Sequence, residues 1–108
     1  MKAWDIYTAD VFGEHPCVLV SCQPRIEAKP EVVVLGCRTL RPGNERAPRA
    51  NEVLLDASDG LELRTLCRCD LLFTVDKSKL GRRRGSVTFE RRREIARKII
   101  QGLAIAGM

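Results

Sequence analysis

The sequence predicts a mainly β domain, in which a compact antiparallel sheet or barrel of five to seven strands precedes one C-terminal helix. Short segments rich in β-forming residues, separated by Pro, Gly, Asp or Asn, fill most of the chain. Such close spacing favours antiparallel pairing over βαβ units, which need a long crossover between strands. A sustained helical repeat of apolar residues occurs only near the C-terminus, so we expect a single helix there.

Five stretches have the composition of strands, and the gaps between them have the composition of loops. We expect two longer loops over 22–30 and 41–51, because prolines recur in both. A turn is expected over 81–85, where two glycines bracket three arginines. The expected strands are 3–8, 17–21, 32–37, 52–56 and 65–75.

The C-terminal helix is expected from about Thr88 to Ala106. Thr88 or Ser86 can cap its first turn, and Glu90 favours the positive end of the helix dipole. Apolar residues recur every four positions and are expected to pack on the sheet: Ile95, Ile99 and Leu103, with Ala96, Ile100 and Ala104. The basic residues of the helix are expected to cover its outer surface: Arg91, Arg92, Arg93, Arg97 and Lys98.

Length and composition are those of one globular domain. The chain has 108 residues, of which 44% are hydrophobic and 31% charged, and it shows neither an internal repeat nor a linker. We therefore expect a single domain over 1–108. No apolar run approaches the ~20 residues that cross a bilayer, and the first residues lack the apolar stretch of a signal peptide. These features predict a cytoplasmic protein without a membrane partner.

The cysteine pattern disfavours a metal site. The chain has five cysteines, an odd number, and none is spaced as Cys-x-x-Cys. His15 is the only histidine. Cys67 and Cys69, two apart on one strand, are poorly separated for a disulfide. We expect reduced, buried thiols, no metal and no cofactor.

Positive charge is concentrated in one segment. The net charge is +5, and residues 77–98 contain ten Lys or Arg against Glu90 and Glu94 alone. The rest of the chain carries nine basic and twelve acidic residues. Such a segment suits a polyanionic partner, although a solvated helix face explains it equally well.

The last expected strand contains a distinctive motif. Arg68-Cys69-Asp70 is followed by Thr-Val-Asp-Lys-Ser-Lys-Leu-Gly over 74–81. This block resembles the MazF/PemK (Kid-like) toxin family of bacterial toxin–antitoxin systems, which carries Cys-Asp-Gln-x-Arg-Thr-x-Asp-Lys there. Leu71 and Phe73 stand where that Gln and Arg usually occur. Segments 4–7, 15–21 and 33–39 resemble the first three strands of the family, so the likeness extends from about residue 3 to residue 106.

The resemblance implies both a fold and an activity. The fold would be an SH3-like antiparallel β-barrel of the CcdB/PemK type with a C-terminal helix. The activity would be that of a metal-independent endoribonuclease toxin, which cleaves single-stranded RNA such as mRNA and inhibits growth until a cognate antitoxin neutralises it. The resemblance also implies a homodimer.

The resemblance assigns Asp70 as the base that takes the proton of a ribose 2′-hydroxyl, and Arg68 as the acid or the phosphate-stabilising group. Side chains two apart on a strand share one face about 7 Å apart, so a phosphate fits between them. Arginine is a slow proton donor, which favours electrostatic stabilisation by Arg68. His15 could then supply the mobile proton, since histidine titrates near neutral pH. Thr39 would position the phosphate.

Each of these assignments has a simpler alternative. Arg68 and Asp70 fit a partly exposed ion pair, His15 fits an ordinary loop residue, and Thr39 fits a plain β-former. The side chains expected to contact the RNA backbone are Arg38, Lys77, Lys79, Arg82, Arg83 and Arg84. The three consecutive arginines equally fit a solubilising hairpin tip, and Asp76 with Lys77 fits a pair that stabilises a turn.

A second function remains open at this stage. The arginine usual in the family before Pro16 is replaced by His15, and Leu71 and Phe73 remove two polar groups suited to holding RNA. These departures also fit a non-catalytic protein on the same scaffold. Such a protein would be a CcdB-like inhibitor of a protein target, or a degenerate member that only binds RNA or an antitoxin.

Overall fold

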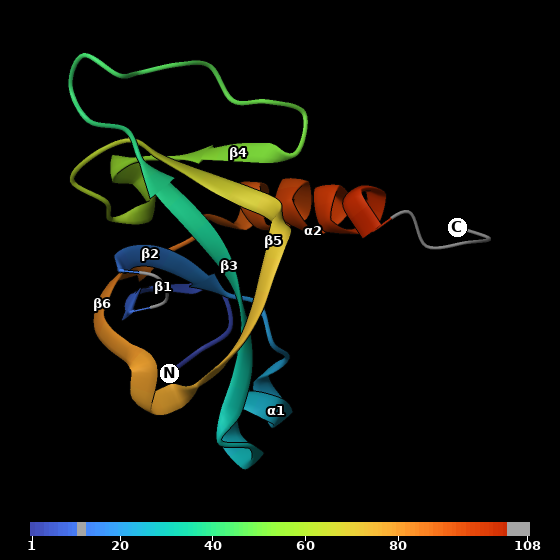
Figure 1. The fold of residues 1–108 in the computed structure, drawn as a ribbon. Coiled ribbons are helices and arrows are strands. Elements are labelled where there is room, and N and C mark those ends of the chain that lie inside the picture. Colours follow the sequence, from blue (N-terminus) through green and yellow to red (C-terminus); the bar gives the residue numbers. More distant parts are fainter. Residues whose placement is uncertain (11–12, 104–108) are drawn as a thin grey trace.

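Six strands pair antiparallel in the computed structural model of the protein, which describes residues 1–10 and 13–103. The sheet order is β4-β5-β3-β2-β1-β6, so β4 and β6 are its two edges (Figure 1). The predicted mainly β fold is confirmed, but the sheet is open, so the term barrel fits it only loosely. The strands are β1 (Asp5–Asp10), β2 (Glu14–Leu19), β3 (Glu31–Thr39), β4 (Glu52–Leu55), β5 (Thr65–Asp76) and β6 (Leu80–Ser86).

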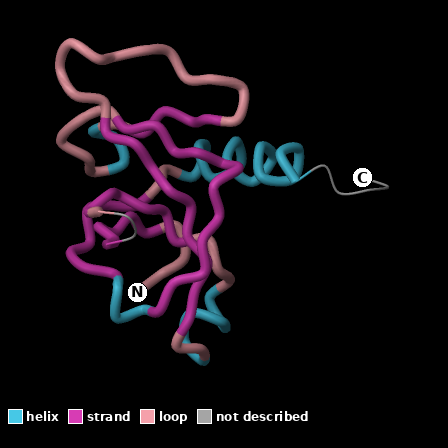
Figure 2. The backbone as a smooth tube through the Cα atoms, in the orientation of Figure 1, coloured by secondary structure: helices cyan, strands magenta, loops and turns pink. Residues whose placement is uncertain are grey.

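The helix α2 (Phe89–Leu103) confirms the predicted C-terminal helix. Its predicted end at Ala106 lies outside the described residues. A second helix, α1 (Gln23–Ala28), shows that the loop predicted over 22–30 was wrong. Pro24 lies in the first turn of α1, where a missing backbone N–H costs no helical hydrogen bond. The predicted loop is correct over 41–51, which contains no helix or strand (Figure 2).

The turn predicted over 81–85 was also wrong, because these residues belong to β6, which pairs with β1. Gly85 marks a close approach between backbones, since a Cβ there would lie 1.9 Å from the carbonyl oxygen of Asp59. The actual turn is η2 (Lys77–Lys79), where the Asp76 carboxylate accepts a 2.8 Å hydrogen bond from the Ser78 amide. Lys77 donates a 2.7 Å hydrogen bond to the Ile26 carbonyl of α1.

Two apolar clusters fill the interior. The larger one joins the sheet to α2 and includes Ile6, Val18, Leu35, Val53, Leu55 and Ile95. The smaller one includes Tyr7, Leu19, Ile26, Val32 and Val34, with Phe73 packed against it. Four of the five free cysteines are buried, and Cys22 is exposed. No helix in the described part of the chain is long and apolar enough to cross a membrane.

The predicted apolar stripe of α2 is only partly confirmed. Ile95 is fully buried and Ile99 packs against the larger cluster, whereas Ile100 and Leu103 are exposed. The prediction that Arg91 and Arg92 cover the outer surface was wrong. Arg91 instead pairs with carboxylates at η1 (Ala57–Asp59), and Arg92 donates a hydrogen bond to the Val87 carbonyl at 2.8 Å.

Arg91 fastens α2 to the rest of the fold through two carboxylates. Its guanidinium forms ion pairs with Asp56 and with Asp59, whose side chain is fully buried. Asp59 also accepts a 2.9 Å hydrogen bond from the Thr88 amide, just before α2 begins. The Arg91 guanidinium, followed by the Ser58 amide, lowers the pKa of Asp56 to about 2. Folding therefore gains stability from Asp56 above its ordinary pKa and loses it as the pH falls toward 2.

Arg91→Met is expected to lower the free energy of unfolding at pH 7 by about 3 kcal/mol, because Asp59 keeps a buried charge without its partner. Urea denaturation measures this loss. The difference from wild type should shrink as the pH falls toward 2, because Asp56, whose pKa is lowered by Arg91, then becomes protonated. Arg97→Met, on an exposed part of α2, should have little effect. Equal losses in both variants would contradict this role of Arg91.

Candidate functional site

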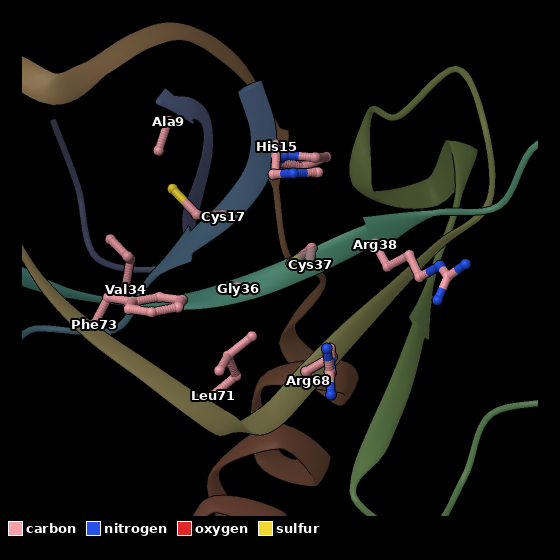
Figure 3. Close-up of a pocket in the computed structure, with 11 residues that line it drawn as sticks. Ala9, His15, Cys17, Val34, Gly36, Cys37, Arg38, Arg68, Leu71 and Phe73 are labelled. Carbon is pink, nitrogen blue, oxygen red and sulfur yellow. The ribbon is translucent and has the colours of Figure 1, made fainter. Parts of the chain in front are cut away.

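A cavity of about 450 Å³ lies where β2, β3 and β5 run side by side. Three side chains from these strands bring nitrogen groups to it: His15 of β2, Arg38 of β3 and Arg68 of β5. Figure 3 shows them at one side of the cavity, while Ala9, Cys17, Val34 and Phe73 lie at the other. We call the side with His15, Arg38 and Arg68 the cationic half of the cavity. The side with Ala9, Cys17, Val34 and Phe73 is the apolar half.

The cavity arises from an irregular pairing of β3 with β5. Cys37 pairs with Cys67 and Leu35 with Leu72, so residues 68–71 of β5 lie opposite Gly36 alone. Extra residues in one strand bend it and redirect its side chains. The bend of β5 is visible beside α2 in Figure 1.

Gly36 permits this arrangement because it lacks a side chain. A Cβ at Gly36 would lie 2.8 Å from the Leu71 side chain and 3.2 Å from the Phe73 ring. The two side chains therefore pack directly over the backbone of β3. They form the floor of the apolar half.

The cationic half has no compensating negative charge among the residues that line it. Arg38 and Arg68 are exposed, and neither forms an ion pair within residues 1–10 and 13–103. No carboxylate is among the described residues that line the cavity. Unpaired guanidinium groups offer planar donors to phosphate oxygens. This half is therefore suited to an anion.

Two further hollows share His15 with the cavity. One, of about 260 Å³, contains Thr39 and Arg38 beside Arg41 and Asn44. The other contains Thr39 together with Arg82 and Arg84 of β6. Of the predicted site residues, the structure therefore gathers these around His15: Arg38, Thr39, Arg68, Arg82 and Arg84.

The other predicted residues lie elsewhere. Asp70 is not among the residues lining the described hollows, and a Cβ on Gly102 of α2 would lie 3.7 Å from its Cβ. Arg83 faces away from Arg82 and Arg84 and forms a 3.3 Å ion pair with Asp5. Lys77 bonds to α1 as described above. Lys79 is exposed on the η2 turn.

Sequence reasoning missed Arg41 and Asn44 and the ion pair that secures their loop. Arg46 contacts both carboxylate oxygens of the buried Glu52 at 2.7 and 2.8 Å. This contact is the main reason that the pKa of Glu52 is lowered to about 2. The loop is thereby tied to the start of β4 beside the second hollow. Nothing in the sequence indicates that Arg46 pairs with Glu52 in particular. The positive charge of Arg41 in a predicted loop was a signal that could have identified it as a site residue.

The described residues contain no group of three or more His, Cys, Asp or Glu side chains placed to hold a metal ion. The chemical groups of the cavity and the two hollows are an imidazole, guanidinium groups, the Thr39 hydroxyl, the Asn44 amide and, in both hollows, the Glu14 carboxylate. An imidazole exchanges protons near neutral pH, and guanidinium groups stabilise developing negative charge. Together they provide the elements of acid–base chemistry on a phosphate ester.

The fold is similar to solved toxin structures. An endoribonuclease in complex with its cognate antitoxin, from a mycobacterial species, matches with a TM-score of 0.83 and 23% identity over 100% of this chain and 99% of that chain. The Mycobacterium tuberculosis toxin MazF-mt6 matches with a TM-score of 0.78 and 23% identity, over 92% and 95% of the two chains. A MazE-MazF structure from Deinococcus radiodurans matches with a TM-score of 0.76 and 15% identity, over 98% and 97%.

These identities establish similarity of fold. No curated protein sequence matches the chain. A family model described as the PemK-like, MazF-like toxin of type II toxin-antitoxin systems matches residues 2–103. That match covers nearly the whole chain, and it agrees with the resemblance found around Arg68 and Asp70. The protein therefore belongs to the PemK-like, MazF-like toxin family of type II toxin–antitoxin systems.

Proposed function

We propose that the protein is a metal-independent endoribonuclease toxin that cleaves single-stranded RNA, such as mRNA, at the cavity between β2, β3 and β5. Family membership supports this proposal, as do two similar structures that are described as endoribonucleases. The observation that carries it is the cationic half of the cavity. There, His15, Arg38 and Arg68 line one side of the cavity, and no carboxylate is among the described residues that line it.

The reaction would begin with attack by a ribose 2′-oxygen on the adjacent phosphorus. The new O–P bond forms as the bond from phosphorus to the 5′-oxygen breaks, which leaves a 2′,3′-cyclic phosphate and a 5′-hydroxyl. His15 takes the proton of the 2′-hydroxyl and returns one to the leaving 5′-oxygen. Arg38 and Arg68 stabilise the negative charge that builds up on the phosphate oxygens.

Thr39 would help to position the phosphate, because it lines both further hollows together with His15. The base role is given to His15 because it lines the cavity and both hollows, whereas Asp70 lines none of the three and the Glu14 carboxylate lines only the hollows. The role of Asp70 that follows from the family resemblance stays a prediction. A direct comparison of the two residues decides between them.

The biological setting follows from the family. We propose that the chain works as a homodimer in the cytoplasm, where mRNA is available, and that a cognate antitoxin neutralises it. Similar structures are described as complexes with a cognate antitoxin or as MazE-MazF. The second candidate function is a non-catalytic toxin-fold binding protein. It is favoured by Leu71 and Phe73, which make one half of the cavity apolar.

His15→Ala should reduce cleavage of single-stranded RNA by about 10²-fold or more, because the proton shuttle is lost. Asp70→Asn should retain most of the activity. The measurement is fragment formation from RNA in the presence of EDTA, with all proteins purified in the same way and circular dichroism confirming the fold. The reverse ranking would return the base role to Asp70. Absence of cleavage by the wild type across several sequences would favour the binding-protein function.

The strand β6 gives a matched test of RNA backbone contact. Arg82 and Arg84 face the hollow beside His15, whereas Arg83 faces Asp5. Replacing both Arg82 and Arg84 with Gln should weaken RNA binding and flatten its salt dependence, by about 0.7 in the log–log slope for each lost phosphate contact. Arg83→Gln should leave the slope unchanged. The same slope in both variants would mean that these arginines only solubilise the surface.

A further inference from the structure

We propose that Arg46 and Glu52 are positioning residues for RNA, because their ion pair holds the loop over 41–51 in place beside His15. This inference rests on the proposed function, since two side chains of the loop line the same hollow as His15, the one of about 260 Å³: Arg41 and Asn44. Neither Arg46 nor Glu52 is among the described residues that line this hollow. The ion pair would therefore affect RNA only through the loop.

Apart from its two ends, the loop is held to the rest of the protein by Glu52. Figure 1 shows it as the long arc between β3 and β4, and residues 41–50 are all exposed except Arg46. Within residues 1–10 and 13–103, every hydrogen bond that joins 41–50 to another part of the chain involves Glu52. Besides Arg46, the Arg49 amide donates to its carboxylate at 2.8 Å. The Glu52 amide in turn donates to the Arg49 carbonyl at 3.0 Å.

Glu52 itself is held by the sheet and by α2. Its side chain is only 2% exposed, and its partner across the β4–β5 pairing is Arg68. Lys98 of α2 donates a 2.8 Å hydrogen bond to the Glu52 carbonyl. The Arg46 guanidinium lowers the pKa of the Glu52 carboxyl to about 2, so the ion pair is intact at neutral pH. If the ion pair were lost, the loop would therefore move and Glu52 would stay.

The part of the loop that lines the hollow lies between two fixed ends. At the first end Leu40 is buried, and its amide donates a 2.8 Å hydrogen bond to a backbone carbonyl just before β5. Arg46 is the second end. Between them, the Asn44 amide donates a 3.0 Å hydrogen bond to the Arg41 carbonyl, across a turn where Gly43 has a φ of 89°. This turn brings Arg41 and Asn44 to the same hollow, and releasing Arg46 would free one of its ends.

The hollow can receive a further phosphate of an RNA that is bound at the cavity, because His15 and Arg38 line both. The hollow adds the guanidinium of Arg41, which forms no ion pair within the described part of the chain. Its two guanidinium groups outweigh the carboxylate of Glu14, so it keeps a net positive charge. Guanidinium groups bind phosphate oxygens through charge-assisted hydrogen bonds. Correct placement of Arg41 would thus add affinity for RNA without contact to the reacting atoms.

The test measures binding of single-stranded RNA with every 2′-hydroxyl methylated, which is not cleaved by 2′-hydroxyl attack. Fluorescence anisotropy at several salt concentrations gives the dissociation constants. Arg46→Met should raise the dissociation constant by about tenfold, as expected for the loss of one charge-assisted contact. The log–log salt slope should flatten by about 0.7, because one phosphate contact is lost at Arg41. With cleavable RNA, KM should rise while kcat changes little, since His15 and Arg68 are kept.

A double-mutant cycle separates positioning from a general loss of stability. In a background that already carries Arg41→Gln and Asn44→Ala, Arg46→Met should have no further effect on RNA binding. Arg49→Gln is the matched control, because Arg49 is exposed and bonds to Glu52 through its backbone; it should keep the wild-type salt slope. Arg46→Met leaves a buried carboxylate unpaired. If it does not fold, Arg46→Met combined with Glu52→Gln takes its place, with the same expected results.

Equal losses with and without Arg41 and Asn44 would overturn the positioning role, as would wild-type affinity after loss of the ion pair. The same flattening of the salt slope in Arg49→Gln would also overturn it, because the positive charge of the loop as a whole would then attract RNA. In each of these cases, cleavage of RNA by the wild type would leave the proposed function intact. If the wild type neither binds nor cleaves RNA, the proposed function and the positioning role both fail.

Discussion

The pairing of β3 with β5 is interrupted at Gly36, where one residue of β3 faces residues 68–71 of β5. Residues 65–68 of β5 pair with β4, and α2 packs against both strands. Residues 72–76 of β5 pair with residues 31–35 of β3. Because of this irregular pairing, β5 can pair with β4 in its first part and with the beginning of β3 in its last part. The irregular pairing also places Arg68 on the same side of the cavity as Arg38 and His15, and it places Leu71 and Phe73 over the glycine.

The distribution of charge separates residues that hold the fold from residues that remain available to a ligand. Arg46, Arg83 and Arg91 each contact a carboxylate that is buried or partly buried. Arg38 and Arg68 do not, within the described residues. Unpaired positive charges at one cavity repel each other and lower the stability of the fold. Such an arrangement is expected at a functional site, where ligand binding is favoured at the expense of stability. An RNA phosphate would compensate this charge.

Much of the fold could be predicted from local patterns. β-Forming segments and the helical apolar repeat gave the strands and α2, because these signals depend on neighbouring residues. The errors occurred where contacts between residues far apart in the sequence determine the local structure. Gly85 looked like a turn residue, but it is required by the approach of Asp59. Pro24 looked like a loop residue, but it lies in the first turn of α1, whose Ile26 is buried in the smaller cluster.

The sequence singled out individual residues of the candidate site, but it did not show how their side chains are arranged in space. The resemblance drew attention to Arg68, and ordinary histidine chemistry drew attention to His15. Arg68 and Asp70 both alternate with the buried Cys69 and are both exposed, but of the two only Arg68 lines the cavity. Likewise, three adjacent arginines were treated as one group, whereas the pleat of β6 separates Arg83 from its neighbours. Register and bends depend on the partner strand, which the local sequence does not reveal.

The central claim is that RNA binds at the cationic half of the cavity, with His15 at the reacting phosphate. The most direct test is a titration of ¹⁵N-labelled protein with single-stranded RNA in which every 2′-hydroxyl is methylated, so that it is not cleaved by 2′-hydroxyl attack. NMR of the side-chain nitrogens follows binding. The imidazole of His15 and the Nε–Hε groups of Arg38 and Arg68 should shift most, whereas those of Arg83 and Arg91, already held by carboxylates, should shift little. Shifts concentrated on the outer arginines of α2, with His15, Arg38 and Arg68 unchanged, would contradict it.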